Sequence, residues 1–197
     1  STYKGQLSII NTYRWNLSGT NTWSRSSLNT LNLNTNFITN IKETWANKID
    51  TTSWKIGGNT WINIGTSVPS TTYKNEITNA VTTNTMDNAT VYNAKIGLMY
   101  VSDYGYAAEP SAWTLTMSNY NDTIALSTNW MYMGLYEWTI TRSANSTKWS
   151  IYIAPAGHVY YNEIDSDSMT IRPTFYLTSA VTYSSGTGTS SDPIRIN

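Results

Sequence analysis

His158, the only histidine of the chain, is the residue best suited to general acid–base chemistry near neutral pH. It follows Pro155-Ala156-Gly157, a sequence typical of a turn. A catalytic histidine needs a nucleophile and an orienting acid, but no serine lies in a G-x-S-x-G motif. The chain has no cysteine, which excludes thiolate catalysis and disulfides. These residues predict a protein that is not an enzyme, with no catalytic residue and with His158 at the end of a hairpin.

Three carboxylates at alternate positions, Glu163, Asp165 and Asp167, would share one face of a strand. Carboxylate oxygens are the ligands that Ca²⁺ prefers, but the D-x-D-x-[DN]-G spacing of a calcium loop is absent. A solvated loop is the favoured interpretation. The sequence therefore predicts no cofactor and no metal site, with Ca²⁺ as the ion that this trio would take.

Glu137 stands between Tyr136 and Trp138 inside an apolar run, so we expect it to be buried. A buried carboxylate needs a cationic partner, which is Arg142 or, as the preferred choice, Arg172. Pro173 cannot donate a hydrogen bond to a neighbouring strand, so it should begin an edge strand or lie at a bulge.

The nine Trp and fifteen Tyr divide into two predicted groups. The first group lies in apolar patterns and is predicted to be core: Trp15, Trp45, Trp54, Trp61, Trp130 and Trp138. The second lies among Ser, Asn, Asp and Lys between Arg142 and Arg172, a composition typical of recognition surfaces. The predicted ligand-binding residues are Asn145, Lys148, Trp149, Tyr152, His158, Tyr160, Asn162, Glu163 and Asp165.

The formal net charge is zero and charged residues make up 12% of the chain. Nucleic-acid binding depends on neutralising phosphates, so we expect no nucleic-acid partner. The longest apolar run, Ile96–Val101, is too short to span a bilayer. The aromatic content excludes disorder, and the many Thr, Ser and Asn side chains favour strands and turns.

Apolar residues at Leu33, Phe37, Ile41, Trp45 and Ile49 recur at every fourth position. This spacing predicts an amphipathic helix over residues 33–49, with Ile41 and Trp45 on its buried stripe.

The remaining elements are predicted mostly as strands. Residues 6–17 and 91–101 are expected to be strands, residues 54–64 a hairpin turned at Gly57-Gly58-Asn59, and residues 130–140 a strand pair turned near Gly134. Residues 69–87 fit either a short helix or a loop and strand, and residues 103–129 a long loop that is either functional or pinned by aromatics. Strands around residues 151–153, 158–161 and 171–177, and a last strand after Gly186 and Gly188, complete an α+β domain: a twisted antiparallel sheet with one principal helix.

Five segments carry a resemblance to a known family: Y-R-W-N-L-S-G (13–19), K-I-G-L-M-Y-V-S-D-Y-G-Y-A (95–107), W-T-I-T-R (138–142), I-R-P-T-F-Y-L (171–177) and G-T-G-T-S-S-D-P-I-R-I (186–196). Together they resemble Firmicutes prepilin-like and C-type-lectin-like bacterial surface proteins. The resemblance implies a C-type-lectin-like fold, an extracellular location at the cell surface, and one domain over residues 1–197. It also implies an anchoring segment that has been removed before Ser1.

Two functions remain open from the sequence. The first is a cell-surface or pilus-associated adhesion module that binds a protein or glycan on another cell or surface non-covalently through its C-terminal loops. The second is a structural, pilin-like subunit that self-assembles through its polar, low-charge surface.

Overall fold

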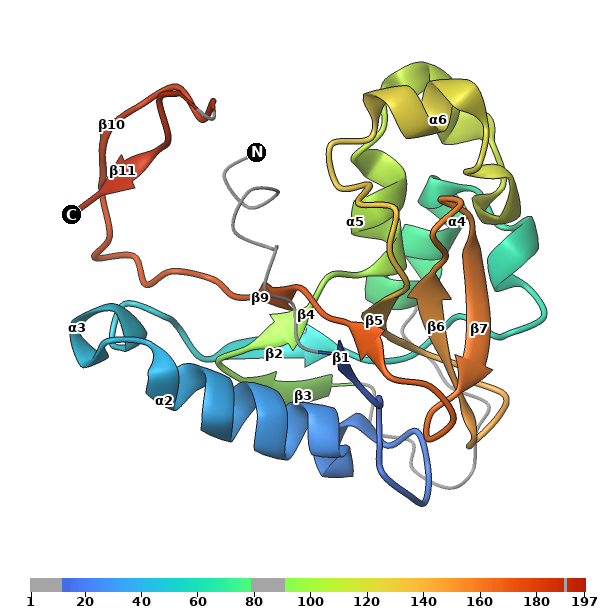
Figure 1. The fold of residues 1–197 in the computed structure, drawn as a ribbon, viewed down its shortest axis with the longest axis horizontal. Helices are drawn as coiled ribbons and strands as arrows, with labels where there is room; N and C mark the ends of the chain where they lie inside the picture. The colour runs from blue at the N-terminus through green and yellow to red at the C-terminus, as the bar shows by residue number, and fades with distance from the viewer. Residues whose placement is uncertain (1–11, 79–90, 190) are drawn as a thin grey trace.

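The computed structural model describes residues 12–78, 91–189 and 191–197 (Figure 1). The strands are β1 (Thr12–Tyr13), β2 (Thr52–Lys55), β3 (Val91–Ala94), β4 (Gly97–Leu98), β5 (Glu137–Arg142), β6 (Trp149–Ile153), β7 (Val159–Glu163), β8 (Met169–Thr170), β9 (Pro173–Thr174), β10 (Tyr183–Ser185) and β11 (Arg195–Ile196). The α-helices are α2 (Ile38–Asn40), α3 (Glu43–Ala46), α4 (Pro69–Tyr73), α5 (Val101–Tyr106) and α6 (Thr123–Thr128). The 3₁₀ and π turns are η2 (Trp23–Arg25), η3 (Leu28–Phe37), η4 (Ile64–Thr66), η5 (Lys74–Thr78), η6 (Pro110–Thr114) and η7 (Met117–Asn119).

The main sheet has five strands in the order β1-β8-β5-β6-β7. Its neighbours are antiparallel except β5 and β8, which run parallel. Smaller two-stranded sheets pair β2 with β3, β4 with β9, and β10 with β11. Helices and sheets thus combine as the sequence predicts for an α+β protein, and the antiparallel prediction is wrong for the β5–β8 pair.

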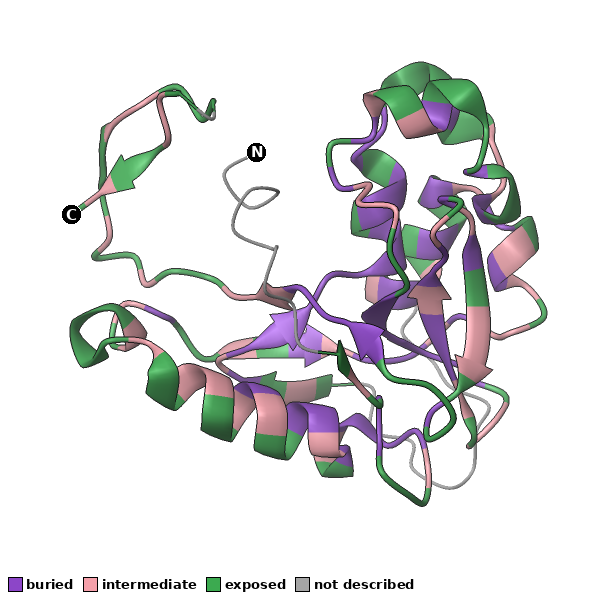
Figure 2. Ribbon diagram, in the orientation of Figure 1, coloured by how far each residue is buried: buried purple, intermediate pink, exposed green. Residues whose placement is uncertain are grey.

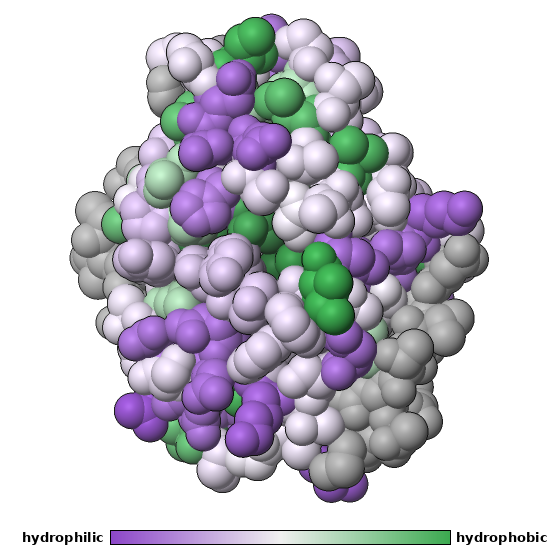
Figure 3. Space-filling view, turned by 90° about the vertical axis from the view of Figure 1, so that its right-hand side faces the viewer, coloured by the Kyte–Doolittle hydropathy of each residue, from purple (hydrophilic) through white to green (hydrophobic). Residues whose placement is uncertain are grey.

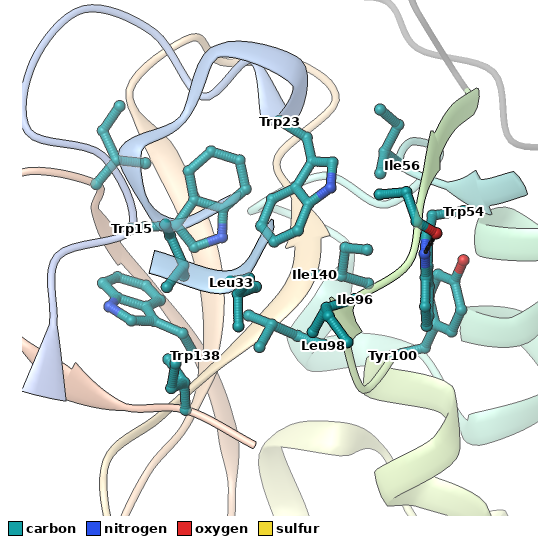
Figure 4. Close-up of a cluster of buried hydrophobic side chains, with 14 of the residues drawn as sticks. Trp15, Trp23, Leu33, Trp54, Ile56, Ile96, Leu98, Tyr100, Trp138 and Ile140 are labelled. Atoms are coloured by element: carbon teal, nitrogen blue, oxygen red, sulfur yellow. Dashed lines mark hydrogen bonds between the residues drawn. The ribbon is translucent and has the colours of Figure 1, made fainter. Parts of the chain in front are cut away.

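The centre of the molecule is β5, all six residues of which are buried. A first apolar cluster connects η3 to β4 and β5 through Leu33, Leu98 and Ile140 (Figure 4). A second cluster connects the β6–β7 hairpin to the helical layer through residues such as Ile151 and Tyr104. Figure 2 shows this burial concentrated in the middle of the molecule, while the β10–β11 segment is exposed or half-buried.

The predicted ion pair between Arg172 and Glu137 is confirmed. Arg172 Nε donates to Glu137 Oε1 at 3.0 Å and its Nη2 to Oε2 at 2.9 Å, while Nη2 also donates to the Met131 carbonyl at 2.7 Å. Pro173 begins β9 and pairs with Leu98 of β4, as its missing N–H predicts.

The predicted helix over residues 33–49 is wrong in its bounds and its phase. Helical structure begins at Leu28 and ends near Asn40, because Ile41 is extended with φ −80° and ψ 132°. The turns of η3 are wide: Thr35 Oγ1 donates to the carbonyl of Thr30, five residues earlier. The break and the wide turns shift the apolar stripe, so Leu33 is buried but Trp45 is 46% exposed and Ile41 half-buried.

The predicted hairpin over residues 54–64 is also wrong. The partner of β2 is β3, with Lys55 opposite Val91, and the Trp54 indole N–H donates to the Ala94 carbonyl at 3.0 Å. The indole N–H of the buried Trp54 needs a hydrogen-bond acceptor, and β3 supplies one, which favours pairing of β2 with β3 over a hairpin turned at residues 57–59.

The loop predicted over residues 103–129 instead forms α5, η6, η7 and α6. Its predicted pinning by aromatics is confirmed by Tyr120, which is fully buried and donates to the Gly105 carbonyl at 2.8 Å. The predicted strand over residues 91–101 is divided into β3 and β4, and α5 begins at Val101. Residues 69–78 are helical, while residues 6–11 and 79–87 lie outside the described residues.

Further predictions concern the buried tryptophans, the strand pair over residues 130–140 and the last strand. Trp15, Trp54 and Trp138 are buried as predicted, whereas Trp61 is half-buried. Trp130 is 61% exposed, because the strand begins only at Glu137 and residues 130–136 lie outside any helix or strand. The predicted last strand after Gly186 and Gly188 is confirmed as β11.

We expect Leu33→Ala to lower the free energy of unfolding by about 2–5 kcal/mol, because it removes a fully buried side chain and leaves a cavity. Trp45→Ala should lower it by less than about 1 kcal/mol, because its exposed ring loses little packing. Urea denaturation of both variants measures this difference, and an equal loss would show that Trp45 packs in the core.

Candidate functional site

The candidate site is built on the β6–β7 hairpin, which lies at one edge of the main sheet. Ile151, Ile153 and Val159 point into the second apolar cluster and are buried. Because side chains alternate along a strand, these anchors leave positions 150, 152, 160 and 162 on the other face. Three apolar residues therefore hold the hairpin, and Tyr152, Tyr160 and Asn162 of the other face reach the surface, whereas Ser150 is fully buried and donates to the Thr141 carbonyl.

The hairpin turn is fixed by Gly157, which has φ 93°. A Cβ at this position would lie 2.2 Å from Leu126 Cδ2 and 2.9 Å from the Tyr120 carbonyl oxygen, so no other residue fits. The Tyr104 hydroxyl donates to the Gly157 carbonyl at 2.8 Å. The turn, with His158 beside it, is thus held by the buried helical layer.

Five rings from β6, β7 and the loop before η4 form a continuous row, which we call the aromatic edge: Trp61, Trp149, Tyr161, Tyr160 and Tyr152. Trp61 meets Trp149 edge-on with 4.6 Å between centroids, and Trp149 stacks on Tyr161 at 4.8 Å. Tyr160 stacks on Tyr161 at 4.5 Å, although the two are neighbours on an edge strand. The row therefore continues around the outer edge of β7, where no further strand covers it in the sheet.

A pocket of about 360 Å³ lies at one end of the aromatic edge, and we call it the tyrosine pocket. Tyr136 and Tyr152 supply its rings, with centroids 5.8 Å apart. Asn162 Nδ2 donates to Asp167 Oδ2 at 2.7 Å beside them, and a carboxylate has further lone pairs that can accept hydrogen bonds. A second pocket of about 270 Å³ lies on the other side of Tyr160 and Tyr161, against Trp61. The aromatic edge thus separates two concave surfaces.

Figure 3 looks onto the side of the molecule that lies at the right of Figure 1, where β7 is found. Near-neutral and hydrophilic residues predominate there, and hydrophobic ones are scattered. The surface therefore offers rings and polar groups rather than one large aliphatic patch.

All nine predicted ligand-binding residues are exposed or half-buried. Trp149, Tyr152 and Tyr160 belong to the aromatic edge, Asn162 lines the tyrosine pocket, and the His158 ring lies 6.4 Å from that of Tyr160. The other four lie at the opposite end of the hairpin from His158: Asn145, Lys148, Glu163 and Asp165. The structure thus brings five of the nine together around the rings.

Sequence reasoning missed Trp61, Tyr136, Tyr161 and Asp167 as site residues. Tyr161 follows Tyr160 and could have been added from the strand pattern alone. Trp61 could not, because it comes from a loop whose contact with Trp149 joins residues far apart in the chain.

Within the described residues, the acidic trio does not form a group of three or more side chains able to hold a metal ion. Glu163, Asp165 and Asp167 are exposed, and Asp167 accepts from Asn162. The partner of the Asp167 carboxylate is thus the neutral side-chain amide of Asn162, an arrangement that is typical of a solvent-exposed turn.

Two carboxylates are buried away from these pockets. Glu76 is 1% exposed and accepts hydrogen bonds from the backbone N–H groups of Val101 and Ser102 and from the Thr141 hydroxyl. Burial raises the pKa of Glu76 to about 7, and these hydrogen bonds only partly oppose the increase. Burial also raises the pKa of Glu137, against the effect of Arg172. Their burial separates both groups from a surface substrate, so we assign them to packing.

Comparison of the chain with protein-family models, with curated proteins and with solved structures gives no match. Among the helices of the described residues, none has the length and apolar character needed to cross a membrane.

The free energy of unfolding should decrease as the pH rises from about 4.5 to about 7. In this window the folded protein keeps the proton on Glu76 that the unfolded chain releases, so the folded state binds more protons and loses stability with increasing pH, by up to about 3 kcal/mol. Glu76→Gln should flatten this dependence while leaving the part that Glu137 contributes.

Urea denaturation between pH 4 and pH 8 tests this expectation, with Glu43→Gln, an exposed carboxylate, as the matched control. An unchanged pH dependence in Glu76→Gln would show that this carboxyl titrates normally in the folded protein.

Proposed function

We propose that this chain is a recognition module that binds a glycan non-covalently through the aromatic edge and the tyrosine pocket. The observation that carries the proposal is the row of five rings that ends beside a hydrogen-bonded Asn162–Asp167 pair. The rings and polar groups of the site provide a surface for binding, and the buried carboxylates Glu76 and Glu137 lie outside this surface.

The chemistry of the site suits a sugar ring. A pyranose has an apolar C–H face, which packs on an aromatic ring, and a rim of hydroxyls that need both donors and acceptors. Tyr136 and Tyr152 supply the rings, Asn162 a carboxamide and Asp167 a carboxylate acceptor. A pocket of about 360 Å³ is the size of sites that hold small ligands.

The resemblance to Firmicutes surface proteins supports a place at the bacterial cell surface or on a pilus. In that setting the ligand would be a glycan on another cell or surface, and adhesion the result. As part of the same proposal, the fold of the chain is of the C-type-lectin-like kind.

The alternative, a self-assembling structural subunit, is supported by a different feature. The β10–β11 pair extends from the body (Figure 1), and Tyr183 is 65% exposed on it. An isolated two-stranded hairpin is marginally stable in water, so contact with another copy would stabilise it.

We expect Tyr160→Ala to weaken glycan binding by about 2 kcal/mol or more, because its exposed ring connects Tyr161 to Tyr152 in the aromatic edge. Its cost in stability should stay below about 1 kcal/mol, since the side chain is 46% exposed. Binding is measured first on an array of bacterial and host surface oligosaccharides, then by calorimetry with the best array ligand. Trp149→Ala should weaken binding too, at a larger cost in stability because its ring is half-buried.

The matched control is Tyr183→Ala, which removes an exposed tyrosine on the β10–β11 hairpin. Normal glycan binding in Tyr160→Ala would contradict the proposal. If Tyr183→Ala instead abolishes concentration-dependent self-association in sedimentation experiments, the structural-subunit function is the better one.

A further inference from the structure

A pocket separate from the aromatic edge lies where α5, the turn after α6 and β9 meet, and we call it the Asp103 pocket. Its volume is about 400 Å³. Its walls include Met99, Asp103, Tyr106, Trp130, Met131 and Thr174. Most of this surface is apolar or aromatic, and the carboxylate of Asp103 is the charged group on it.

The carboxylate of Asp103 is held in place without a cation. Its Oδ2 accepts the Tyr100 backbone N–H at 2.9 Å, which also fixes the start of α5. The ion pairs among the described residues are Arg172–Glu137 and Arg195–Asp192, and Asp103 belongs to neither. Burial raises the pKa of Asp103 above its usual value, and the Tyr100 hydrogen bond opposes this. The pocket therefore carries a negative charge that a bound cation would compensate.

The aromatic walls of the pocket, Trp130 and Tyr106, are exposed, and the ring of Tyr106 is held by its neighbours. Trp130 is among the most exposed large apolar residues of the described chain, although it stands beside two methionines of the pocket. Tyr106 packs edge-on against Trp113 with centroids 5.0 Å apart, and Trp113 donates its indole N–H to the Ala108 carbonyl at 2.8 Å. A ring that is held by its neighbours loses little freedom when it binds a ligand.

From these contacts we propose that the Asp103 pocket binds a quaternary ammonium head group. Trp130 and Tyr106 line the pocket with rings whose quadrupoles attract a cation, and Asp103 adds an opposite charge. The sulfur atoms of Met99 and Met131 are polarizable and pack well against methyl groups. The site thus supplies both the charge and the apolar contacts that N-methyl groups need.

The apolar walls also discriminate between kinds of cation. A primary ammonium group has three N–H donors, which need acceptors when they are buried. Asp103 and the hydroxyls of Tyr106 and Thr174 are the side-chain oxygen acceptors here, while the walls formed by Met99, Ala107, Trp130 and Met131 offer no strong side-chain acceptor. A quaternary ammonium has no N–H, so it leaves no donor unsatisfied against the methionines.

Choline and tetramethylammonium chloride are the probes for this proposal. We expect saturation-transfer NMR to detect their methyl signals on the whole chain, and calorimetry to give a Kd below about 10 mM for each. The uncharged choline isostere 3,3-dimethyl-1-butanol tests the charge, and Nα-acetyl-lysine amide tests the primary ammonium. Both should bind about tenfold more weakly than choline.

Two substitutions connect the binding to the pocket. Asp103→Asn keeps an acceptor for Tyr100 N–H but removes the charge, and Trp130→Ala removes an exposed ring; each should weaken choline binding by about tenfold. The matched controls are Glu109→Gln and Trp45→Ala, which change an exposed carboxylate and an exposed tryptophan outside the pocket. Circular dichroism confirms that each variant is folded.

The proposal is overturned if choline shows no saturable binding, or if the uncharged isostere binds as tightly as choline. Unchanged choline affinity in folded Asp103→Asn and Trp130→Ala would place the binding elsewhere and overturn it too. Tighter binding of the lysine derivative would show that the pocket takes a primary ammonium instead. Glycan binding through the aromatic edge is measured independently, so either proposal can fail without the other.

Discussion

The structure depends on one constraint: β5 is buried along its whole length, yet four of its six residues are polar or charged. Buried polar groups are costly unless they are hydrogen-bonded, so each neighbour of β5 must supply a partner. Arg172 neutralises Glu137, Glu76 accepts from Thr141, and the Ile56 carbonyl accepts from Arg142. The Thr139 hydroxyl donates to the Ile151 carbonyl, which ties β5 to β6. The hydrogen bonds that the buried polar side chains of β5 require thus hold together elements from distant parts of the chain.

This constraint also positions the candidate site. Because β5 fixes β6, and β6 pairs with β7 along its full length, the aromatic edge stands on a strand whose inner neighbours cannot shift independently. A rigid support of this kind lowers the entropy that binding would cost. The loops at the far end of the hairpin are held by a different part of the chain: Asn21 Nδ2 donates to the carbonyls of Ser143, Ser146 and Trp149, and the Asn16 N–H donates to the Ile164 carbonyl.

The sequence predicted those features that depend on local chemistry. Glu137 could be matched with Arg172 because a carboxylate in an apolar run requires a cation, and the buried positions of the β6–β7 hairpin followed from alternation. Prediction from the sequence failed for features that depend on contacts between residues far apart in the chain. The predicted helix had the wrong buried face, because Asn34 exchanges hydrogen bonds with the backbone of Ile96. These bonds hold η3 against the segment that leads into β4. The contact of Trp61 with Trp149 likewise leaves no local pattern.

The pairing of β1 with β8 has a mechanical consequence. The strands are antiparallel, and Thr12, where the chain enters β1, lies opposite Thr170, where it leaves β8. A force applied between the two ends of the chain would therefore peel these strands apart one hydrogen-bonded pair at a time, instead of shearing all pairs at once. A load that enters at one end and leaves through a ligand on β7 would instead cross the interior of the sheet, where the side chains of β5 share the tension. Attachment geometry, more than thermodynamic stability, would then set how long the domain stays folded under load.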